Sequence, residues 1–170
     1  MKNTIRLAAA VAALAAAGSL ATAANAATAS ASASAEILST LNVVKDQDLN
    51  FGQIAVNGAG TVVVGTGATP DSCSALLVCA GSTQKANFVV TGAKNIGVAA
   101  SVQQTSVSLT SGSNSMALDN FTLYFPNGTT LTGSGTTGST NFEVGGTLHV
   151  AAGQATGVYS GTFNVNVSYN

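Results

Sequence analysis

The two cysteines are the first candidates for chemically reactive side chains in this chain. Cys73 and Cys79 lie in the segment DSCSALLVCA, and the chain has no other cysteine. Such a pair can form a disulfide, act as a redox site or remain as free thiols, whereas a metal site is disfavoured because the sole histidine is far away in the sequence. We expect a disulfide, which closes a small ring and shapes a hairpin or a bulge.

Acid–base and metal chemistry have few other candidates. His149 lies between Leu148 and Val150 in an expected strand, so it should point outward and alone, and no GxSxG pattern surrounds it. Asp46 and Asp48 fall on one face of a strand and could share a calcium ion, but calcium takes about six to eight oxygens and no DxDxDG loop follows. We therefore expect solvated carboxylates, no metal, no cofactor and no catalytic residue, hence a protein that is not an enzyme.

Aromatic side chains could instead form a platform for a carbohydrate. The candidates are Phe121, Tyr124, Phe125 and Phe142. Aromatic residues in strands usually belong to the core, and the chain lacks tryptophan, so the sequence predicts core positions for these four.

The most regular element that could position any of these groups is the last stretch, GVYSGTFNVNVSYN, from Gly157 to Asn170. One parity of this stretch is apolar or small and the other, from Ser160 onward, is polar. The first parity holds Gly157, Tyr159, Gly161, Phe163, Val165, Val167 and Tyr169. A period of two is typical of a half-buried β-strand.

The other end of the chain reads as a secretory signal peptide over residues 1–26. It starts with Lys2 and Arg6, continues through an apolar run and ends in the small-residue motif Ala24-Asn25-Ala26. The apolar run is too short for the roughly twenty residues that span a bilayer, and no later segment is long enough. We expect a mature protein that starts at Ala27, has no integral membrane segment and is secreted or held at the cell surface after passing through the periplasm.

Residues 27–44 form a second alternating segment, an N-terminal extension before a domain over 45–170. Its small apolar parity consists of Ala29, Ala31, Ala33, Ala35 and Ile37, with Ser, Thr and Glu between them. An extended segment of this kind can serve as a donor strand, which enters a neighbour's groove and pairs with its backbone. The other interpretation of the same segment is a flexible Ala/Ser linker.

Composition favours a protein that packs against copies of itself. Of the five Lys and Arg residues two precede Ala27, which leaves three lysines against six acidic residues, a net charge of −3. A nucleic-acid partner is therefore not expected. Only 6% of residues are charged, against roughly 25% in typical soluble proteins, so repulsion between copies is weak.

The middle of the chain consists of short apolar segments separated by Gly, Asn and Ser. The expected strands are Leu49–Val56, Thr61–Val64, Asn87–Thr91, Val98–Val102, Val107–Thr110, Ala117–Phe125, Phe142–Ala151 and the terminal strand. Turns at Asn57-Gly58 and Pro126-Asn127-Gly128 fit hairpin corners. This pattern predicts an all-β fold, an antiparallel immunoglobulin-like β-sandwich.

The two ends and the middle also carry a resemblance to known families. The penultimate Tyr169 and Gly157, fourteenth from the end, resemble the last strand of chaperone-usher pilus subunits. The segments NFGxI at 50–54, Gly146-Thr147-Leu148 and the last strand are similar to an uncharacterised family of secreted bacterial domains, domain of unknown function 4402, and more distantly to spore coat protein U. The resemblance implies an incomplete sandwich, whose groove is filled first by a periplasmic chaperone and then, at an outer-membrane usher, by the next subunit's extension.

The resemblance and the two alternating ends together lead to two expectations for function. The first is a structural, pilin-like subunit that joins other copies or related subunits by donor-strand exchange and can contribute to adhesion. In it the acceptor strand presents Gly157, Tyr159, Phe163, Val165, Val167 and Tyr169. The second is a stand-alone secreted sandwich that binds a glycan or a surface partner through loops such as 127–141.

Overall fold

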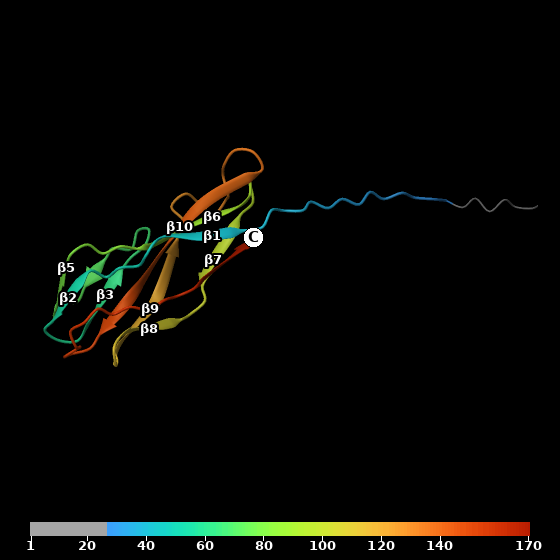
Figure 1. Ribbon diagram of the computed structural model, residues 1–170. Helices are drawn as coiled ribbons and strands as arrows, with labels where there is room; N and C mark the ends of the chain where they lie inside the picture. Colours follow the sequence, from blue (N-terminus) through green and yellow to red (C-terminus); the bar gives the residue numbers. More distant parts are fainter. Residues whose placement is uncertain (1–26) are drawn as a thin grey trace, which may run out of the picture. The chain divides into compact units, whose positions relative to one another are not determined.

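The described residues form strands and no helix. The computed structural model describes residues 27–170 (Figure 1), so the signal peptide expected at 1–26 lies outside the described residues. Residues 27–36 contain no strand and are exposed, and the β domain occupies residues 37–170. Within the described part of the chain, no helix is long and apolar enough to cross a membrane.

Eleven strands are present in residues 27–170, and every pairing between them is antiparallel. They are β1 (Asn42–Gln47), β2 (Gln53–Val56), β3 (Gly60–Val64), β4 (Ser72–Cys73), β5 (Leu77–Ala80), β6 (Ala86–Ala93), β7 (Val98–Val102), β8 (Ser106–Ser111), β9 (Asn114–Tyr124), β10 (Thr137–Val150) and β11 (Val165–Tyr169). The all-β, antiparallel fold expected from the sequence is confirmed, and its arrangement is sandwich-like.

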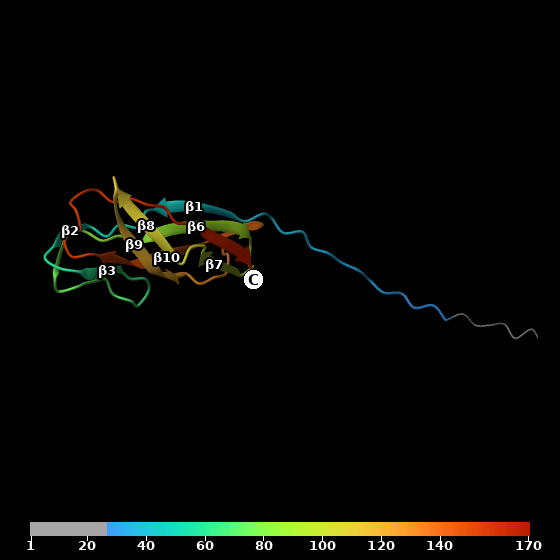
Figure 2. The ribbon, with the colours of Figure 1, turned by 90° about the horizontal axis from the view of Figure 1, so that it is seen from below.

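Strand β10 organises the main, seven-stranded sheet (Figures 1 and 2). It pairs with β6 through residues 137–144, with β3 through 146–150 and with β9 through 143–149. β10 has two edges. The range that pairs with β9 overlaps the ranges that pair with β6 and with β3, so β9 occupies one edge of β10. β6 and β3 therefore share the other edge, where they pair with successive parts of β10. The sheet thus divides at this point, with β1 and β6 on one part and β3 and β4 on the other.

A glycine stands where β10 changes partner. Gly145 is buried, and a Cβ on it would lie 2.1 Å from the carbonyl oxygen of Val64. Real Cβ atoms do not approach a backbone oxygen so closely, so the close contact between β10 and the end of β3 requires glycine here.

Two small sheets complete the domain: β2 pairs with β5, and β11 pairs with β7. The predicted pairing of the cysteines is confirmed, with the Sγ atoms of Cys73 and Cys79 2.02 Å apart. Cys73 lies on β4 opposite Val62, and Cys79 lies on β5 opposite Ile54. The short bridge therefore ties the edge of the main sheet to the β2–β5 pair, and does more than shape a single hairpin or bulge.

The core consists of two clusters, and β10 supplies side chains to both. Leu148 and Val150 belong to the cluster that contains Val62, Val64 and Phe51. Phe142 and Val144 belong to the other cluster, in which Phe142 stacks on Phe88 with ring centroids 5.1 Å apart. The strand connects the two halves of the core as well as the two parts of the sheet.

Most of the expected strands are present, with shifted ends. The segment 98–102 forms β7 with the expected bounds, and 61–64 forms β3 with one added residue. The expected strand 49–56 is reduced to β2 at 53–56, and the polar strand β1 and the short β4 and β5 were not expected. The Asn57-Gly58 turn is no hairpin corner, since β2 and β3 belong to different sheets.

Candidate functional site

The apolar parity of the terminal segment faces the core, as predicted. Tyr159, Phe163, Val165, Val167 and Tyr169 are partly buried, and every even-numbered residue from Ser160 to Asn170 is exposed. The strand itself is shorter than expected, because only Val165–Tyr169 pairs with β7. Residues 157–164 approach the sheet through an isolated bridge between Ser160 and Thr110, and Gly157 is exposed.

Strands β1 and β11 are among the strands that have one edge uncovered by any other strand in residues 27–170. β1 ends the order of the main sheet and pairs with β6 alone, and β11 pairs with β7 alone. Both strands pack side chains against the same core cluster, β1 through Val43 and β11 through Val165, Val167 and Tyr169. Two free edges therefore flank one hydrophobic core, and the side chains along them are only partly buried.

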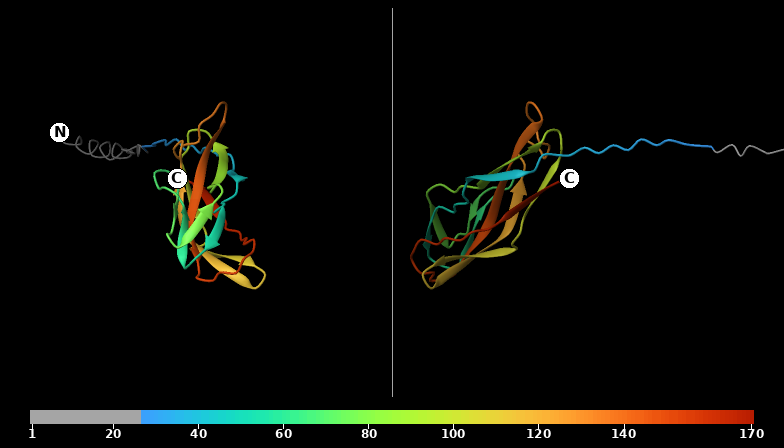
Figure 3. Two further views of the ribbon diagram at one scale, coloured as in Figure 1. Left: turned by 90° about the vertical axis from the view of Figure 1, so that its left-hand side faces the viewer. Right: turned by 45° about the vertical axis from the view of Figure 1, so that its right-hand side comes forward.

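Tyr169 holds the ends of these two strands near each other. Its hydroxyl donates to the backbone oxygen of Ser39, 2.7 Å away, and accepts a hydrogen bond from the backbone nitrogen of Ala93, also at 2.7 Å. The chain just before β1 and the end of β11 thus meet beside the end of β6, and in Figure 3 (right) β1 starts on the side of the C-terminal mark to which β11 leads. This tyrosine therefore ties the end of β11 to the chain just before β1.

The expected donor residues make no strand. Ala29, Ala31, Ala33, Ala35 and Ile37 are all exposed, and the Ile37 residue is 96% exposed. Burying an isoleucine side chain completely is favourable by about 2 kcal/mol, and the exposed Ile37 does not gain this free energy. Strand β1 starts at Asn42, so residues 42–44, which were assigned to the extension, are part of the sheet.

The residues considered for acid–base or metal chemistry are exposed. His149 is exposed as predicted, but it is not alone: its Nε2 lies 2.8 Å from Oδ1 of Asp119 on β9. Asp46 accepts a hydrogen bond from Asn87, and Asp48 contacts Lys45. Within residues 27–170 no group of three or more His, Cys, Asp or Glu side chains lies close enough to hold a metal ion.

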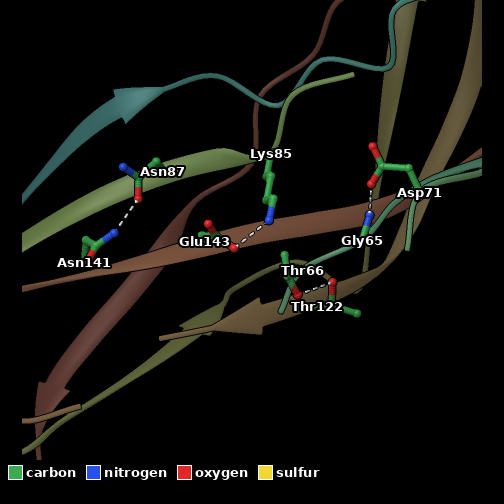
Figure 4. Close-up of polar contacts among 8 residues, drawn as sticks. All are labelled: Gly65, Thr66, Asp71, Lys85, Asn87, Thr122, Asn141 and Glu143. Atoms are coloured by element: carbon green, nitrogen blue, oxygen red, sulfur yellow. Dashed lines mark hydrogen bonds and ion pairs between the residues drawn. The ribbon is translucent and has the colours of Figure 1, made fainter. Parts of the chain in front are cut away.

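A polar cleft, which the sequence did not predict, lies where β6 and β3 separate along β10 (Figure 4). Its volume is about 260 Å³. Its lining is Gln47, Asp71, Thr83, Gln84, Lys85, Ala86, Asn87 and Glu143. Asp71 accepts hydrogen bonds from the backbone nitrogen of Gly65 at 2.9 Å and from the hydroxyl of Thr83, and Lys85 lies 3.0 Å from Glu143. These contacts fix charged groups on two sides of the cleft.

The loop proposed for a stand-alone binding module is tied to the sheet. Asn127 donates to Asn141 at 2.7 Å, and Thr140 donates to the backbone oxygen of Gly128 at 2.7 Å. Leu131, in the middle of this loop, is fully buried in the core. The loop is thus partly a structural connection, and its polar side chains bond to one another.

Comparison with known proteins places the domain in one family. The family described as "Domain of unknown function (DUF4402)" matches residues 41–169. The chain belongs to this family. The DUF4402 match starts one residue before β1 and ends at the last residue of β11, so both free-edged strands are part of the family domain. No curated protein and no solved structure matches the chain, and the likeness to spore coat protein U and to pilus subunits stays a prediction.

Proposed function

We propose that the protein is a structural, non-enzymatic subunit of a secreted or cell-surface assembly, in which an extension from one copy completes the sandwich of the next. The observation that carries the proposal is the pair of free edges, on β1 and β11, that flank one core cluster. An added strand would pair with the backbone of such an edge and cover its partly buried side chains. The assembly could serve in adhesion.

The alternating extension supplies a strand of suitable character. Its five apolar positions, from Ala29 to Ile37, can face a core while the Ser and Glu positions between them face water. Alanine methyls contribute on the order of 1 kcal/mol each, so Ile37 and the backbone hydrogen bonds would provide much of the affinity. Before assembly, a periplasmic chaperone could cover the same edges, and an outer-membrane usher could exchange it for the next subunit.

The parity of the extension gives the sharpest test. In protein that starts at Ala27, the pair Ala33→Asp with Ala35→Asp places two charges on the apolar parity, and the matched control, Ser32→Asp with Ser34→Asp, places the same charges on the polar parity. We expect the first pair to abolish assembly, because burying an unpaired charge is costly, and the control to retain it. Light scattering gives the mass, and unboiled gels should show a ladder only for the wild type and the control.

Deletion of residues 27–37 tests the same idea without new charges. The truncated chain should remain a soluble monomer, because residues 27–37 contribute no side chain to the core clusters. If the wild type, the deletion and both aspartate pairs have the same mass and none forms a ladder, the subunit proposal fails and the stand-alone binding module becomes the better interpretation.

A further inference from the structure

We propose that the polar cleft between β6 and β3 is a binding site for a neutral carbohydrate. This inference does not depend on strand exchange, because the cleft involves neither β11 nor residues 27–37 and includes β1 only at its last residue, Gln47.

The cleft is built into the fold. β6 pairs with β10 as far as Ala86 opposite Val144, and β3 pairs from Val64 opposite Gly146, so the two strands succeed each other across Gly145. The cleft opens beside this point, between residues 83–87 and Asp71. The chain after β3 contributes Asp71 to the lining, and the bond from the backbone nitrogen of Gly65 holds this carboxylate in place. The polar groups that line the opening are therefore held in place before any ligand arrives, which lowers the cost of binding.

The side chains of the cleft match the chemistry of sugar hydroxyl groups. Each hydroxyl both donates and accepts, and the lining offers carboxylate acceptors at Asp71 and Glu143, ammonium donors at Lys85, and side-chain amides at Gln47 and Gln84 that do both. The three charges sum to −1, which favours a neutral ligand over an acidic one. A volume of about 260 Å³, just below the range of about 300–1,000 Å³ that is usual for small-molecule sites, suits one or two sugar rings.

An exposed aromatic residue outside the lining pairs with one of the lining residues, Glu143. Tyr124 on β9 is directly opposite Glu143 on β10, so both side chains project from the same face of the sheet. The tyrosine is 44% exposed, and its ring lies against Gly67, where a Cβ would come within 2.8 Å of the ring. The sequence predicted Tyr124 as a core residue, whereas its exposed ring can stack on the apolar face of a pyranose.

Saturation-transfer NMR and calorimetry on protein starting at Ala27 test the proposal with defined probes. The probes are maltose, cellobiose, lactose, mannobiose and chitobiose at up to about 10 mM, a range that reveals millimolar dissociation constants. We expect at least one to bind, with chemical-shift changes at Lys85, Asn87 and Glu143. The acidic sugar sialyllactose, as comparator, should bind at least about threefold more weakly.

Variants then locate the site. Tyr124→Ala should weaken binding about fivefold to tenfold, Tyr124→Phe should preserve it, and Asp71→Asn should weaken it by a similar factor. The control, Leu76→Ala, alters a side chain of an exposed residue outside the cleft lining and should change nothing. The proposal is overturned if no neutral probe binds, if sialyllactose binds as well, or if Tyr124→Ala and Asp71→Asn both bind like the wild type. Because Tyr124 is exposed, its variants should fold. The ligand-induced chemical-shift changes of the wild type locate the site without any variant and so give an independent readout.

Discussion

At the scale of single residues, we expect the hydroxyl of Tyr169 to contribute to the stability of the fold, although this residue lies near the end of the chain. It is the acceptor for the backbone nitrogen of Ala93, a residue only 8% exposed. Tyr169→Phe should therefore lower the free energy of unfolding by about 1–3 kcal/mol, because a buried donor loses its partner. Urea denaturation followed by circular dichroism measures this change.

A matched tyrosine provides the control for that variant. The hydroxyl of Tyr159 also makes two hydrogen bonds, with Gln154 and the backbone oxygen of Ala155, and the bond to Ala155 is exposed. Tyr159→Phe should cost less than about 1 kcal/mol, because water can replace the partners. Equal losses for the two variants would contradict the role assigned to Tyr169.

The disulfide should make a modest contribution to stability. A ring closed by Cys73 and Cys79 is small, so the loop-entropy model gives about 2 kcal/mol. The double change Cys73→Ser with Cys79→Ser should lower the urea midpoint by a matching amount and leave the far-ultraviolet spectrum native. Loss of the folded spectrum would show that the disulfide between β4 and β5 contributes more to stability than this estimate, and an unchanged midpoint would show that it contributes less.

At the scale of elements, the change of partner along β10 should be sensitive to one methyl group. Gly145→Ala places a Cβ against the oxygen of Val64 and should cost about 3 kcal/mol, since neither backbone can move without breaking a pairing. Gly97→Ala is the control, because the nearest atom to a Cβ there is 3.6 Å away, at Asn170. Thermal unfolding of both variants checks the difference, and similar melting temperatures would rule out the strain at Gly145.

The same scale shows how far sequence patterns reach. Short apolar segments predicted β3 and β7. Alternation predicted the inward face of β11, because side-chain parity decides burial in a half-buried strand. It missed β1, in which Lys45, Asp46 and Gln47 are exposed at a sheet edge and show no apolar parity. The predicted terminal strand was too long, because the alternating pattern continues through 157–164, where the backbone makes an isolated bridge at Ser160 and a single hydrogen bond at Asn164 and forms no strand.

The polar cleft could not be predicted in the same way. Its residues come from the end of β1, the chain after β3, the chain before β6 together with the start of that strand, and the middle of β10. Their proximity results from the division of the sheet at Gly145, and no local pattern in the sequence specifies which strand pairs with which half of β10. The free edges of β1 and β11 likewise follow from the topology, although the alternating ends pointed to them.

At the scale of the whole molecule, the proposed assembly should be insensitive to salt. The chain is 6% charged, and the surfaces proposed to join are apolar side chains and backbone. Light scattering should therefore give the same mass from about 0.05 to about 1 M sodium chloride, because screening acts on charges and leaves apolar burial intact. Dissociation at the higher concentration would indicate contacts between charged groups in place of strand exchange.

The position of β10 late in the chain has a consequence for the order in which the protein folds. During synthesis, β1 can pair with β6 and β8 with β9 as soon as each has emerged, but β3 and β6 cannot be joined into one sheet before residues 137–150 exist. Val62, Val64 and Val90 are almost completely buried in the finished domain. Until β10 has been made, these side chains remain exposed to solvent. Pairings between residues so distant in sequence make folding slow and leave apolar surface open to aggregation. The nascent chain is therefore vulnerable until residue 150 has been made. A binding partner that shields it during that interval would raise the yield of folded protein without adding to its final stability.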